Sequence, residues 1–204
     1  MADGRADEAR EHAALARGRT LQFVTIGWNL LEVFVTVGLG IAARSLALIA
    51  FGLDSLVEVF ASVVVVWYIA GHHAPGRSSR ALRLVSVAFA VLGAYLAVAA
   101  IYTLWGGEAA GSSPLGIVYL AITAGVMFTL AAMKRRTAAI ARSAPLAAEA
   151  AMTFLDGWLA SGILVALTLN SVAGWWWTDP LAALLVAAFC GREAREHWVE
   201  AAAG

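Results

Sequence analysis

Several acidic side chains lie within segments that are otherwise apolar enough to cross a membrane, and four of them are best placed for chemistry: Glu32, Asp54, Glu58 and Asp156. Ionisable groups are costly at membrane depth, so they usually face one another or a water-filled cavity. Lone acids can also be held by Ser, Thr or Trp side chains of neighbouring helices, which is the structural alternative. The number of these acids makes them the first candidates for a functional site.

Two of the acids lie one helical turn apart. Asp54 and Glu58 are spaced i,i+4, so a helix places both carboxylates on one face. Like charges repel there, and in apolar surroundings one acid stays protonated unless a cation lies between the two. Packing gains nothing from two stacked acids, so the pair favours a function. Carboxylate oxygens suit hard and borderline divalent cations, including magnesium, manganese, iron and zinc.

The depth of the acids in the membrane indicates which of them could lie close to one another. At about 1.5 Å of rise per residue, Glu58 lies roughly 18 Å from the inner end of its helix, and Asp156 roughly 15 Å from the inner end of its own. The two helices could therefore present carboxylates to one another near the middle of the membrane. Glu32 shares a helix face with Asn29, three residues earlier, and a functional role is favoured for it as well.

Several other polar residues are ambiguous or favour a structural role. Glu149 shares a face with Asp156, and interfacial and functional roles are both open for it. Thr178-Asp179-Pro180 is typical of a helix start, so Asp179 is expected to be structural. His72 and His73 could gather metal, but adjacent histidines in a loop are more often simply solvated.

The composition indicates that lipid surrounds most of the chain. Of 204 residues, 61% are hydrophobic and only 14% are charged, against about 25% charged in soluble domains. The net charge is zero, so no nucleic-acid partner is expected. The single cysteine excludes an internal disulfide and a CxxC metal cluster. The sequence has no nucleophile–base pair, phosphate loop or HExxH motif, so neither an enzyme nor an organic cofactor is expected.

Six apolar stretches are candidates for crossing a bilayer, which takes about 20 residues, and the last of them is shorter than the others. They are residues 21–43, 46–70, 82–105, 115–133, 146–169 and 179–194. The sequence therefore predicts an all-α membrane protein, with a six-helix transmembrane bundle over residues 21–194. Residues 1–20 and 195–204 are expected to form tails, and the first tail lacks the apolar core of a signal peptide.

Basic residues predict the orientation of the bundle. Of the 14 lysines and arginines, all but Arg44 fall in the tails or near the even-numbered connections. Because Lys and Arg are enriched on the cytoplasmic side, both termini are expected to be cytoplasmic. The same bias supports an even number of helices.

At these residues the chain resembles the cation diffusion facilitator family of metal/proton antiporters, over about residues 18–198. Residues 45–58 resemble the second-helix signature, in which an Asp or His precedes a Ser and then an acid at i+4. Residues 149–156 resemble the fifth-helix signature, and Asp179-Pro180 resembles the start of the sixth helix. The family has six spans with both termini inside.

The resemblance implies a metal site and a direction of transport. Asp54, Glu58 and Asp156 would bind the metal. The fourth ligand position falls on Met152, whose thioether is a poor ligand for hard cations, so we expect the site to recruit Glu32. The implied activity is proton-coupled efflux of zinc, or of iron, manganese, cobalt or cadmium, through a bacterial plasma membrane.

Many family members carry a cytoplasmic ferredoxin-like domain after the sixth helix, but about ten residues follow it here. A short form is therefore expected, without dimerisation through that domain, and a homodimer of the membrane helices stays open. Two other functions also stay open. A proton-coupled exporter of small solutes would need only a lone acid. A membrane accessory protein that binds metal without transporting it would fit the change at Met152.

Overall fold

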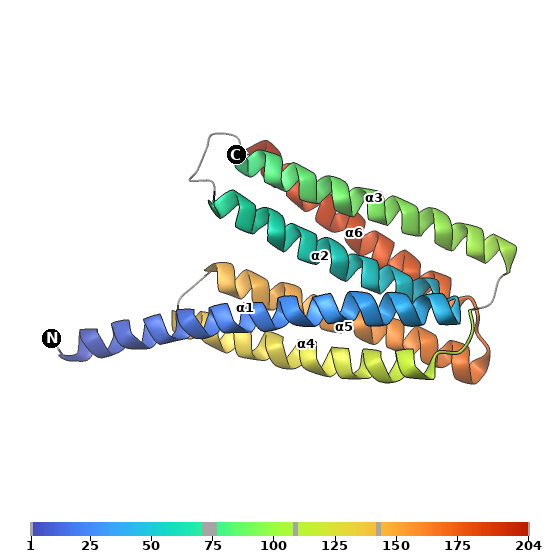
Figure 1. Cartoon of the computed structure of the whole chain (residues 1–204), viewed down its shortest axis with the longest axis horizontal. Helices are drawn as coiled ribbons and strands as arrows, with labels where there is room; N and C mark the ends of the chain where they lie inside the picture. Colours follow the sequence, from blue (N-terminus) through green and yellow to red (C-terminus); the bar gives the residue numbers. More distant parts are fainter. Residues whose placement is uncertain (1, 71–76, 108–109, 142–143, 204) are drawn as a thin grey trace. The chain divides into compact units, whose positions relative to one another are not determined.

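The computed structural model describes residues 2–70, 77–107, 110–141 and 144–203 (Figure 1). Over these ranges the chain is all α-helical, as predicted. The helices are α1 (Ala2–Ala43), α2 (Leu46–Ala70), α3 (Arg77–Gly106), α4 (Pro114–Ala141), α5 (Ala144–Ala173) and α6 (Thr178–Ala203).

Four helices of the described chain are long and apolar enough to cross a membrane. They are Ala16–Ala43, Leu82–Gly106, Pro114–Ala141 and Ala150–Ala173. These correspond to the first, third, fourth and fifth predicted spans, so the chain is a multi-pass integral membrane protein. The second and sixth predicted spans form the helices α2 and α6. The count of six spans and the side on which the termini lie stay predictions, as does the division into tails and membrane domain.

The helices extend beyond the predicted spans. α1 begins at Ala2 and α6 continues to Ala203, so both expected tails are largely helical. α4 continues to Ala141, whereas the apolar stretch ends at Met133. The added segment is rich in Ala, Arg and Lys, which are strong helix formers. Hydrophobicity alone therefore placed the ends of α4 and α6 too early and the start of α1 too late.

The chain forms two compact units. One comprises Met1–Trp28 and Val118–Leu164, and the other comprises Asn29–Ile117 and Val165–Gly204. We call them the α4–α5 unit and the α2–α3–α6 unit. In the second of these, α2, α3 and α6 lie side by side (Figure 1).

A two-residue turn joins α1 to α2. Arg44 has a left-handed φ of 53°, the Ser45 amide donates to the Gly40 carbonyl at 2.9 Å, and the Arg44 amide donates to the Ile41 carbonyl at 3.3 Å. This pair of bonds is the Schellman ending of a helix. Ser45 then caps α2, because its hydroxyl accepts the Leu48 amide at 3.2 Å.

α3 and α6 approach each other closely. A Cβ atom at Gly93 on α3 would lie 3.1 Å from the Ala187 carbonyl oxygen and 3.2 Å from Cys190 Cβ. Further along, the Ser86 hydroxyl donates to the Ala194 carbonyl at 2.6 Å. The small residue at position 93 thus lets α6 pack tightly on α3 beside Cys190.

Candidate metal centre

α2 carries the predicted pair of acids in the α2–α3–α6 unit. Asp54 is 3% exposed, and Glu58 is half-buried one turn later. The Asn29 side-chain amide, from α1, donates to Glu58 Oε2 at 2.7 Å. Asn29 is itself buried, and its Oδ1 has no hydrogen-bond partner among the residues that the structure describes. The carboxylate of Glu58 is therefore oriented by an amide whose carbonyl oxygen is still available.

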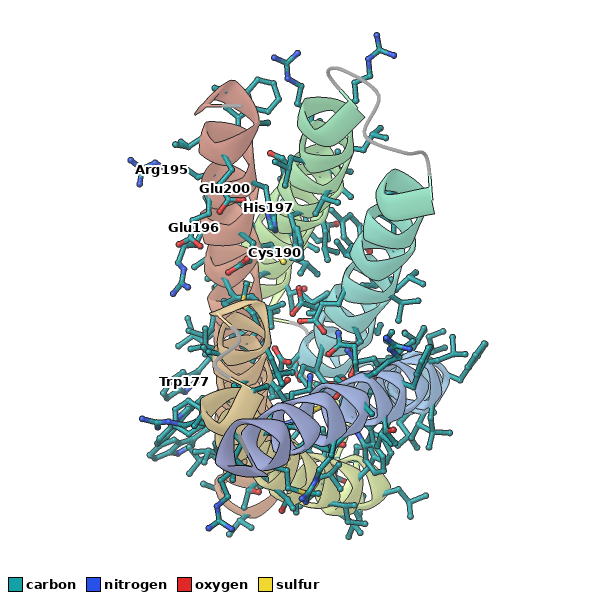
Figure 2. All side chains as sticks on the ribbon, turned by 90° about the vertical axis from the view of Figure 1, so that its left-hand side faces the viewer. Trp177, Cys190, Arg195, Glu196, His197 and Glu200 are labelled. Atoms are coloured by element: carbon teal, nitrogen blue, oxygen red, sulfur yellow. The ribbon has the colours of Figure 1, made fainter. Side chains whose placement is uncertain are left out.

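Asp54 contacts a residue that the sequence analysis did not include in the site. The Cys190 thiol donates to Asp54 Oδ1 at 3.3 Å, and Cys190 is fully buried. Figure 2 shows Cys190 on α6, with Glu196, His197 and Glu200 further along the same helix. Thiolate sulfur is a good ligand for zinc and softer metals. The only signal in the sequence is that this single cysteine falls within the sixth predicted span.

Glu32 lies on α1 and is 2% exposed. It accepts a hydrogen bond from the hydroxyl of Ser55, the residue after Asp54. The structure thus brings Glu32 to α2, in the same unit as Asp54 and Glu58. The serine contact is also what the structural alternative for a lone acid requires.

Asp156 lies on α5, in the α4–α5 unit, and is 9% exposed. Gly157 beside it packs on Phe128 of α4, since a Cβ there would lie 2.9 Å from Phe128 Cε1. Met152, at the fourth ligand position of the family, is 37% exposed. Because Asp156 belongs to a different unit from Asp54, their joint site stays a prediction.

Within the described part of the chain, no group of three His, Cys, Asp or Glu side chains is placed so that it could hold a metal ion. The side chain of Glu149 lies outside the described residues, as do His72 and His73. The structure therefore provides the contacts of the individual acids, and the complete ligand set stays a prediction.

Asp179 has the structural role that its motif predicted, since it lies in the first turn of α6, and it has a second role that the motif did not reveal. Its carboxylate accepts hydrogen bonds from the Ser45 hydroxyl, the Leu46 amide at 2.8 Å and the Ala47 amide at 3.3 Å. These are the first amides of α2, where a helix has unsatisfied donors and favours negative charge. Asp179 therefore lies in the first turn of α6 and also caps α2.

Among the basic residues whose side chains the structure describes, Lys134 is the one that is buried, which the sequence did not predict. It was counted with the basic residues of a cytoplasmic connection, but it lies within α4 and is fully buried. Its ammonium donates to Thr153 Oγ1 on α5 at 2.9 Å. The signal that could have revealed this burial is the helical period of the apolar residues around it, not its charge.

A family model described as the cation efflux transmembrane domain matches residues 81–203, which is more than half of the chain. The matched range contains Lys134, Asp156, Asp179 and Cys190 and begins after Glu32, Asp54 and Glu58. No curated protein matches the chain.

Proposed function

The chain belongs to the cation efflux family and is a metal cation transporter, and from this premise we propose that it exports zinc or a similar divalent metal in exchange for protons. The direction is from the cytoplasm outward, with both termini on the cytoplasmic side. Asp54, Glu58 and Asp156 are the proposed ligands, with Glu32 as a further acid at the site.

The observation that carries this proposal is the surroundings of the acids on α2. Asp54 and Glu58 share one face of α2, Asp54 is almost completely buried, and each carboxylate contacts a polar side chain of another helix. Two charged acids so close together need compensation in apolar surroundings. Either protons or a divalent cation can supply it.

Alternate binding of protons and of a divalent cation at these acids is the proposed chemical basis of exchange. Carboxylate ligands must lose their protons before they bind a metal, so metal binding releases protons and is weakened at low pH. A site that accepts protons from one side and metal from the other exchanges the two. No covalent step is needed, since protons move between carboxylates and water.

Cys190 supports a metal at the softer end of the divalent series. Magnesium and manganese prefer all-oxygen ligands, whereas zinc and cadmium accept sulfur. The Cys190 sulfur lies 3.3 Å from the Asp54 carboxylate, so loss of the thiol proton would place a soft ligand beside a hard one. Zinc, which binds both, is the substrate we propose.

The test is transport by the purified protein in liposomes. A zinc-sensitive dye inside the vesicles reports metal entry, and an imposed pH gradient drives it. We expect concentrative zinc uptake that stops when an ionophore collapses the gradient. Continued accumulation without the gradient would contradict antiport.

Matched variants locate the site in the same assay. Glu58→Gln should abolish uptake, because it removes one ligand charge. Glu196→Gln makes the same chemical change at an acid of α6 that is half exposed, and it should transport normally. Equal activity of the two variants would mean that the acids of α2 do not bind the transported metal.

A further inference from the structure

α4 has a buried stripe with a lysine in the middle of it. The stripe alternates steps of three and four residues, which is the period of one helix face. Its members are Leu120, Ala124, Met127, Ala131, Lys134, Ala138 and Ala141. Lys134 thus occupies a core position among small and apolar residues.

The neighbours of Lys134 show what a basic residue ordinarily does in this part of the chain. Arg135 and Arg136 follow it directly, and both are exposed. Lysine usually extends its charged end to water while its stem covers apolar surface. Lys134 does not, because its side chain is fully buried. A buried ammonium has three donors and is very costly without a negative partner. Thr153 on α5 is one of its hydrogen-bond partners, and Thr153 is neutral.

The geometry of α5 points to the anion. Thr153 and Asp156 are spaced i,i+3, so they lie on one face of the helix, one turn apart. α4 contacts α5 on both sides of Asp156, since Lys134 bonds to Thr153 and Phe128 packs on Gly157. The Lys134 ammonium reaches Thr153 Oγ1 at 2.9 Å. It therefore lies about one turn of α5 from Asp156, on the face that Thr153 and Asp156 share.

We propose that Lys134 is the resident counter-cation of Asp156. In the metal-free protein its ammonium neutralises the buried carboxylate, and a divalent metal that uses this carboxylate must displace it. The second half of this inference rests on the proposed function, whereas the ion pair does not. Lys134 is a positioning residue, because it acts on the metal through Asp156. It would make binding weaker and release faster than the acids alone allow.

A double-mutant cycle on the metal-free protein tests the ion pair. The variants are Lys134→Met, Asp156→Asn and the double variant, melted in detergent with a chelator. Lys134→Met leaves a buried carboxylate unpaired, so we expect the melting temperature to fall by roughly 10 °C. The double variant should regain at least half of that loss. Strictly additive losses would overturn the proposal.

Two further variants keep this test decisive. Arg135→Met removes the same charge from the exposed neighbour and should shift the melting temperature by less than about 2 °C. Thr153→Val removes only the hydrogen bond. If it lowers the melting temperature as much as Lys134→Met does, the bond to Thr153 accounts for the whole effect of Lys134, and the proposal is overturned. If Lys134→Met does not fold, the double variant should fold again. A double variant that also does not fold would contradict the ion pair.

Metal titration tests the displacement. Lys134→Met should bind zinc on the order of tenfold more tightly than the wild type, because no tethered cation competes for Asp156. An unchanged affinity would overturn displacement. If the wild type binds no divalent metal at all, the proposed function fails, but the metal-free cycle still decides whether Lys134 and Asp156 are paired.

Discussion

Replacement of Asp54 by Asn tests the metal centre on α2 through the stability of the protein. The change keeps the size of the side chain and an oxygen that can accept the Cys190 thiol, which now bonds Oδ1 at 3.3 Å, but it removes the charge. A metal that binds only the folded state stabilises it by about 2.7 kcal/mol at one hundred times its Kd. For a chain of this length each kcal/mol shifts the melting temperature by about 2–4 °C.

The wild type should therefore melt about 5–10 °C higher with saturating zinc than with a chelator. If the lost charge weakens binding about a hundredfold, the same zinc concentration stabilises Asp54→Asn by only about 0.4 kcal/mol, or roughly 1 °C. Without metal, Asp54→Asn should be at least as stable as the wild type, since one of two repelling buried acids is neutral. The assay is a thermal melt of the detergent-solubilised protein at fixed pH.

Asp179→Asn is the matched control, because Asp179 is also buried and bonded but caps a helix. Asp179→Asn should lower the melting temperature both with zinc and with a chelator, and it should leave the difference between the two unchanged. Equal zinc-induced shifts in the wild type and Asp54→Asn would refute the reasoning, whatever happens to the control.

Three other outcomes are expected. Asp179→Asn should destabilise the metal-free protein by about 1–3 kcal/mol in denaturant unfolding, because a charged acceptor of three bonds becomes a neutral one; an unchanged midpoint would mean that the cap is dispensable. Cys190→Ser keeps a hydrogen-bond donor to Asp54 but removes the sulfur, so it should weaken cadmium binding about tenfold and leave manganese binding unchanged; equal losses in metal titrations would exclude sulfur as a ligand. In a Cys190→Ser background, cysteines at Ser112 and Ser171 should react with an impermeant reagent from outside and one at Ser78 only from inside; labelling of position 78 from outside would reverse the orientation.

Local pattern was sufficient to predict the helices. Apolar runs of sufficient length identified all six, and the four strongest are long enough to span a membrane in the described chain. Their ends were less predictable, because Ala- and Arg-rich segments continue a helix after the apolar run stops. The i,i+4 relation of Asp54 and Glu58 needed only helix geometry.

The partners of the buried groups could not be predicted, because they come from distant parts of the chain. Cys190 and Asp54 are 136 residues apart, and Ser45 and Asp179 are 134 apart. The sequence around each of these residues does not indicate which distant residue it contacts. The burial of Lys134 could not be predicted for a different reason. Its charge indicates exposure to solvent, whereas its place in the helical period puts it in the core.

The cap that Asp179 forms on α2 has a mechanical consequence. It fastens the first turn of α6 to the first turn of α2, next to the tight turn from α1, so the three helices share a pivot at one end. Glu58 lies about 13 residues along α2 from that pivot, which is a lever arm of roughly 20 Å. Rocking α2 by about 5° would then move Glu58 by roughly 2 Å while the pivot stays closed. That displacement is enough to break the 2.7 Å bond from Asn29. In the predicted orientation the pivot faces outward, so the same motion would open the helices toward the cytoplasm, the side from which the proposed export takes up its metal.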